Sequence, residues 1–115
     1  MPLYPYANYL ETQVLSASPV ELVAILYRAA INSLRTAQQN LATGDMRARI
    51  DATQRATNVV VELTQSLDRS VSAELGGALI SLYDYLLTRI HEANVKADDG
   101  AYEESIKLLS TLLEA

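Results

Sequence analysis

The side chains that could carry acid–base, phosphotransfer or metal chemistry are few and scattered. His91 is the only histidine in the chain, and there is no cysteine. A phosphoaccepting histidine on a helical bundle is one use for it, but phosphotransfer domains carry a lysine three residues later, followed by glycine. Asn94 and Val95 stand at those places here. We therefore interpret His91 as a half-exposed or carbonyl-capping helical side chain, with phosphotransfer only the third-ranked function.

Metal and general acid–base sites also lack their components. A di-metal site in a helical bundle needs Glu-x-x-His pairs on two helices, which one histidine cannot supply. Glu62, Asp84 and Glu92 are isolated in the sequence, so no pair of carboxylates is placed to shift each other's pKa. Phosphate-binding glycine loops and serine nucleophile elbows are absent. The sequence predicts a protein that is not an enzyme and uses no cofactor or metal.

Composition narrows the choice of partners. The chain has 115 residues, a net charge of −5 and no basic run, which argues against nucleic acid and anionic membranes as partners. No apolar run approaches the roughly 20 residues that span a bilayer, and the start lacks a secretory signal pattern. Half of the residues are apolar, enough for a real core. We expect one cytoplasmic domain without membrane insertion.

Proline and glycine divide the chain into long segments of helical periodicity. Ser18, Pro19 and Glu21 form a capping box with proline at the first helical position, which marks a helix start. Gly44 and Gly100 mark breaks. The segments in which apolar residues recur at helical spacing are 19–42, 46–67, 74–97 and 102–113.

These segments predict an all-α fold, an antiparallel four-helix bundle over 18–115 with an N-terminal arm over 1–17. The arm contains Tyr4, Tyr6 and Tyr9 but has no strong helical period. The first and third helices are apolar over more than one stripe. That is typical of a small bundle rich in Ala and Leu, and equally of a groove that accepts a partner segment. The tyrosine-bearing arm favours the groove, because an arm that covers apolar surface can also be displaced.

Two blocks of residues resemble a known family. The first comprises Tyr9, Thr12, Val14, residues 16–19, Glu21-Leu22-Val23, Leu26-Tyr27 and Ala30-Ile31. The second comprises residues 60–63, 66–68, 82–86, Arg89-Ile90 and Glu92-Ala93-Asn94. At these separations, over about residues 6–113, they resemble the flagellar secretion chaperones of the FliS family. Arg28 stands where the family often has Asp, Ala29 where it often has Gly, and the usual C-terminal Ala-Trp is absent.

The resemblance implies a cytoplasmic chaperone of type III flagellar secretion. Its client would be the disordered C-terminal region of flagellin, kept from polymerising before export, and components of the export apparatus would be secondary partners. It also implies a client groove on the first and third helices, formed by Leu22, Ile25, Leu26, Ala29, Leu82, Tyr85, Leu86 and Arg89. Leu26, Leu82 and Leu86 are equally compatible with the core. Tyr6 and Tyr9 are expected to lie over the groove in the free protein.

A competing interpretation is a non-catalytic interaction module. The same apolar faces could form a homodimer, or a helical bundle whose partner is unrelated to flagella. Periodicity does not say which apolar row is covered by neighbouring helices and which is left open.

Overall fold

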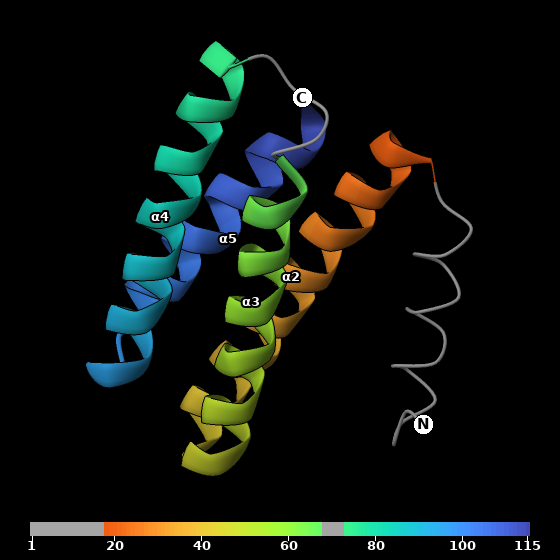
Figure 1. Cartoon of the computed structure of the whole chain (residues 1–115). Coiled ribbons are helices and arrows are strands. Elements are labelled where there is room, and N and C mark those ends of the chain that lie inside the picture. The colour runs from red at the N-terminus through yellow and green to blue at the C-terminus, as the bar shows by residue number, and fades with distance from the viewer. Residues whose placement is uncertain (1–17, 68–72) are drawn as a thin grey trace.

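The computed structural model describes residues 18–67 and 73–115, which form four helices in succession. They are α2 (Pro19–Thr43), α3 (Met46–Leu67), α4 (Ala73–Val95) and α5 (Asp99–Glu114). α2 and α4 each contact both α3 and α5, so the helices form a ring in chain order, and consecutive helices run in opposite directions (Figure 1). The predicted all-α antiparallel four-helix bundle is therefore confirmed. The predicted arm, with Tyr6 and Tyr9, lies outside the described residues.

The start of α2 has the predicted cap. The Ser18 hydroxyl accepts a hydrogen bond from the Glu21 N–H at 3.3 Å and donates one to the Glu21 carboxylate at 3.1 Å. Pro19 occupies the first turn, where no N–H is needed. This local chemistry sets the point at which α2 begins.

The turn after α2 depends on a glycine in the left-handed conformation. Gly44 has φ +79°, and its N–H bonds to the Leu41 carbonyl at 3.3 Å while the Asp45 N–H bonds to the Asn40 carbonyl at 2.9 Å. This is a Schellman motif, which satisfies the carbonyls at a helix end. The Asp45 carboxylate then accepts from the Ala48 N–H at 3.1 Å and starts α3.

The turn after α4 has the same hydrogen bonds but a different residue. The Asp98 N–H bonds to the Ala93 carbonyl at 2.9 Å, and the left-handed position is occupied by Ala97 with φ +50°. The Asp98 carboxylate accepts from the Ala101 N–H at 3.4 Å, so α5 begins at Asp99. The predicted start of the last helix at residue 102 is therefore wrong. Because Asp98 is the cap, Gly100 belongs to the first turn of α5 instead of the break.

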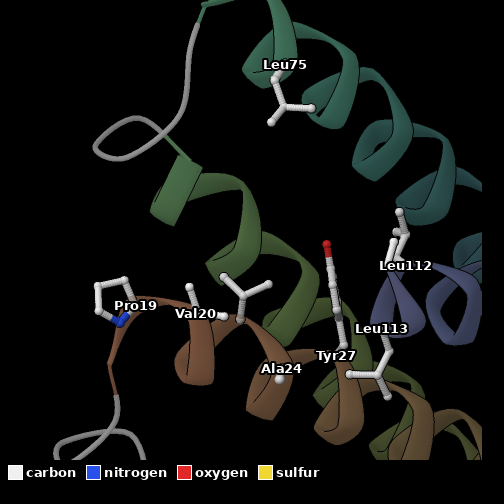
Figure 2. A pocket seen from close by; sticks show the side chains of 9 residues that line it. Pro19, Val20, Ala24, Tyr27, Leu75, Leu112 and Leu113 are labelled. Atoms are coloured by element: carbon white, nitrogen blue, oxygen red, sulfur yellow. The ribbon is translucent and has the colours of Figure 1, made fainter.

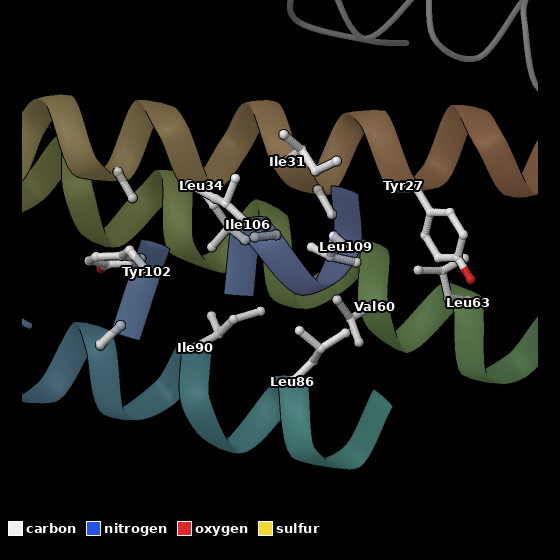
Figure 3. Packing of buried hydrophobic residues seen from close by; sticks show 14 of the residues in the cluster. Tyr27, Ile31, Leu34, Val60, Leu63, Leu86, Ile90, Tyr102, Ile106 and Leu109 are labelled. Carbon is white, nitrogen blue, oxygen red and sulfur yellow. The ribbon is translucent and has the colours of Figure 1, made fainter. Parts of the chain in front are cut away.

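Buried side chains from all four helices meet along the axis of the ring (Figure 3). Two hydroxyl hydrogen bonds cross it between helices that lie diagonally opposite. Tyr27 on α2 and Tyr83 on α4 bond through their hydroxyls at 2.7 Å. The Tyr102 hydroxyl on α5 donates to the Thr53 hydroxyl on α3 at 2.8 Å, because the Thr53 proton is used on the Arg49 carbonyl. Each pair of diagonally opposite helices, α2 with α4 and α3 with α5, is thus linked by a hydrogen bond inside a largely apolar core.

The helices of the ring differ in length. α2 has 25 residues and α4 has 23, whereas α5 has 16. At 1.5 Å per residue α5 is about 24 Å long, roughly 10 to 13 Å shorter than its two neighbours. Because α5 runs back from the end of α4, its last turn lies at the end of the bundle where α2 and α4 begin (Figure 1).

The two Schellman turns predict opposite effects of exchanging glycine and alanine. Gly44→Ala should destabilise the fold by about 1 kcal/mol, because a Cβ is unfavourable in the left-handed conformation. Ala97→Gly should stabilise it by up to about 1 kcal/mol for the same reason. Urea unfolding of both variants, beside the unmodified chain, measures the two changes. Equal signs for the two exchanges would contradict this account.

The buried tyrosine pair predicts non-additive losses of stability. Tyr27→Phe or Tyr83→Phe alone should cost about 1 to 3 kcal/mol, because each leaves the other hydroxyl buried without a partner. The double variant should cost less than the sum of the two. Urea unfolding of the double-mutant cycle measures this coupling, and Tyr85→Phe, on the exposed face of α4, is the control with a small effect. Additive losses would mean that the hydroxyls do not interact.

Candidate functional site

A pocket of about 580 Å³ opens at the end of the bundle where α2 and α4 begin and α5 ends. We call it the end pocket. Its lining comes from the start of α2, the start of α4 and the end of α5: Pro19, Val20, Val23, Ala24, Tyr27, Leu75, Leu112, Leu113 and Ala115. Figure 2 shows Val20, Ala24 and Tyr27 following one another along α2, with Leu75 and Leu112 on the other helices around the same space. Three helix ends that are distant in sequence therefore build one site.

Tyr27 forms the floor of the end pocket. Its side chain is buried, and its ring meets that of Tyr83 edge to face with centroids 6.5 Å apart. Burial and the hydrogen bond with Tyr27 raise the pKa of Tyr83 well above its ordinary value of 10.0, so the phenol stays protonated. The floor is consequently a buried, hydrogen-bonded pair of phenol groups.

The rim of the pocket leaves large apolar side chains in water. Val20 is 81% exposed and Leu75 is 52% exposed. Each buried methylene is worth about 0.8 kcal/mol. An apolar segment that covered these side chains would gain from their burial, whereas a polar ligand would find few hydrogen-bonding groups. The chemistry of the site favours binding of an apolar partner.

The α2 residues predicted for the client groove lie away from the end pocket. Residues two apart on a helix point about 200° away from each other, so Leu22 faces nearly opposite to Val20 and Leu26 opposite to Ala24. Leu26 and Ala29 are buried, and Leu22 packs against the core. Ile25 is half-buried and likewise does not line the pocket. The structure does not bring these four residues together with the apolar opening.

The α4 residues predicted for the groove are divided between core and surface. Leu86 is fully buried in the core, the alternative that its periodicity left open, and Leu82 is half-buried. Leu82 lies two helical turns after Leu75, so both share one side of α4. α2 and α4 lie diagonally in the ring, which places α5 between the two halves of the predicted groove on one side.

Tyr85 and Arg89 belong to a polar network between α4 and α5. Tyr85 donates a hydrogen bond to Glu104, and the Arg89 guanidinium lies 2.9 Å from the Glu104 carboxylate and 3.1 Å from that of Glu92. The hydrogen bond from Tyr85 and the charge of Arg89 lower the pKa of Glu104 below its ordinary value. These surface groups hold α4 against α5 and are already paired with each other.

The structure offers little for catalysis in the residues that it describes. His91 is exposed on α4. Within 18–67 and 73–115, His, Asp and Glu side chains nowhere gather in a group of three that could hold a metal ion. Over the same ranges, no helix has both the length and the apolar content needed to cross a bilayer.

Comparison with known proteins covers nearly the whole chain. Residues 2–115 match the family model described as Flagellar protein FliS. The chain is 37% identical to the flagellar secretion chaperone FliS of Salmonella typhimurium over 106 residues, which are 91% of this chain and 78% of that protein. It is 33% identical to the flagellar secretion chaperone FliS of Bacillus subtilis over 100 residues, 87% of this chain and 74% of that protein.

Proposed function

The chain belongs to the FliS family of flagellar secretion chaperones, and on that premise we propose that its client is the C-terminal region of flagellin. The chaperone binds this region in the cytoplasm and keeps flagellin from polymerising before export. The observation that carries the proposal is the end pocket, an open apolar site floored by a rigid tyrosine pair. Binding without catalysis or cofactor is the activity that such a site supports.

The client's physical state suits a pocket built from helix ends. The flagellin C-terminal region is disordered when free and becomes helical when packed, so binding couples its folding to burial of its apolar face. At the end pocket, Val20 on α2 and Leu75 on α4 keep much of their apolar surface exposed. A client helix packs into the pocket between them, and its apolar side chains cover Val20 and Leu75.

The groove residues predicted from the sequence have different parts in this proposal. Leu82 continues the side of α4 that carries Leu75, so it extends the contact along that helix. Ile25 and Leu22 offer a second contact on the opposite flank of α2. Client contact with Leu26, Ala29 or Leu86 requires helices to separate, because all three are buried.

The N-terminal arm is proposed to cover the apolar site until the client displaces it. Residue 17 is joined directly to Ser18, and Pro19 and Val20 already line the end pocket. Tyr6 and Tyr9 are the arm residues assigned to this cover, since their rings are large and apolar. Components of the export apparatus are proposed to receive the client afterwards.

Self-association is the competing use of the same surface. The exposed Val20 and Leu75 suit a second copy of this chain as well as a client. Sedimentation over a range of concentrations separates the two: a dimer that persists while flagellin fails to bind supports the homodimeric module.

Calorimetry with a flagellin C-terminal fragment from the same organism tests the proposed function. We expect micromolar or tighter binding with a negative change in heat capacity, the mark of apolar burial. Ala24→Trp, which puts an indole into the end pocket, should weaken binding by at least about ten-fold, or about 1.4 kcal/mol.

Ala42→Trp is the matched control, with binding as in the unmodified chain. Ala42 is exposed on the same helix, 18 residues from Ala24. That separation is five full turns, so both positions face the same direction about 27 Å apart. Undiminished binding by the Ala24 variant would place the client elsewhere on the bundle.

Deleting residues 1–15 tests the arm. The deletion should tighten the client affinity or leave it unchanged, because the arm is proposed to compete for the same surface. Calorimetry with the same flagellin fragment gives the comparison. A large loss of affinity would show instead that the arm is part of the binding site.

A further inference from the structure

A second hollow continues from the end pocket along the seam between α2 and α5. It has a volume of about 340 Å³, and we call it the arginine groove. Its lining is Arg28, Ile31, Asn32, Arg35, Ser110, Leu113 and Glu114. Leu113 lines both hollows, so they lie side by side on the surface of α2 and α5. A segment seated in the pocket would therefore reach the groove without leaving the surface of α2.

The two arginines of this groove are exposed on the surface of α2. Neither Arg28 nor Arg35 lies in an ion pair with any residue of 18–67 or 73–115. Arg89, by contrast, is held between two carboxylates. Glu21 is the only acidic residue of α2, and it lies in the first turn. Glu114 is the single carboxylate in the groove lining.

Charge is distributed unevenly over the bundle. Residues 73–115 carry eight acidic and three basic side chains, a net charge of −5. Residues 18–67 carry five arginines and four acidic side chains, a net charge of +1. Arg28 and Arg35 therefore form a positively charged patch beside an apolar pocket, on a protein whose net charge is −5. An acidic ligand is attracted at the groove and repelled by the exposed face of α4 and α5.

We propose that the arginine groove selects a client segment with acidic side chains two helical turns apart, beside the apolar side chains that enter the end pocket. This inference rests on the proposed function and specifies the part of the client that is bound. Arg28 and Arg35 are seven residues apart, or about 10.5 Å along the helix, which matches carboxylates at positions i and i+7 of a client helix. Guanidinium groups pair with carboxylates through two parallel hydrogen bonds, so the two pairs also set the register of the client along α2.

Reversing the charge of Arg28 and Arg35 tests the groove, and the same reversal at two arginines of α3 is the control. The double variant Arg28→Glu/Arg35→Glu should lower the affinity for the flagellin C-terminal fragment by at least about ten-fold and flatten its salt dependence. The control is Arg47→Glu/Arg55→Glu, two exposed arginines of α3 that line neither hollow. Both variants change the net charge by the same amount, so a general electrostatic effect moves them equally. Thermal unfolding checks that both remain folded.

The outcomes separate this proposal from the proposed function. If the unmodified chain binds flagellin and the α2 variant alone loses affinity and salt dependence, the groove proposal is supported. If both variants lose affinity equally, or neither does, the groove proposal is overturned while flagellin binding stands. If the unmodified chain does not bind the fragment, flagellin is the wrong client and the groove proposal fails with it.

Discussion

The hydrogen bond between Tyr27 and Tyr83 joins two helices that stand diagonally opposite in the ring, beside the last turn of α5. The starts of α2 and α4 face each other across the end pocket at this level. The bond spans this gap from inside, with both hydroxyls buried and each satisfied by the other. It links α2 to α4 at the base of the pocket, where the two rings set the spacing between the helices. The end pocket is compatible with a stable core because the hydrogen bond between Tyr27 and Tyr83 links α2 to α4 at its floor.

Helix α2 borders the core, the end pocket and the seam with α5, and these three environments explain its composition. One side carries the core residues Leu34 and Ala37, and an adjoining side carries the pocket residues Val20 and Ala24. Further along the helix, this pocket side reaches the seam with α5 and carries Arg28 and Arg35. A helix that only completed a bundle would need one apolar stripe and a mixed, self-compensating polar face. The extra apolar surface and the uncompensated positive charge of α2 are properties that a binding role requires and folding does not.

Much of this fold could be predicted from residues that act locally. Ser18 and Glu21 mark a helix start, and Gly44 marks a turn, because their effects depend on near neighbours alone. The turn at Ala97 was misplaced because alanine occupies a left-handed position that usually favours glycine. The end pocket was missed for another reason. Periodicity identifies apolar rows on α2, but only the ring order shows which row faces the start of α4 and the end of α5 around the pocket.

A site made from helix ends has an energetic consequence for binding. Helix ends, such as the first turn of α2 and the last turn of α5, open locally at lower cost than helix interiors. A ligand that binds only their ordered form stabilises that form by an amount that grows with ligand concentration over Kd. Binding and fraying therefore oppose each other at the same residues, Val20 to Ala24 and Leu112 to Leu113. Opening of these ends leaves the buried core around Tyr83 and Leu86 intact, so release of a bound segment does not require unfolding of the bundle.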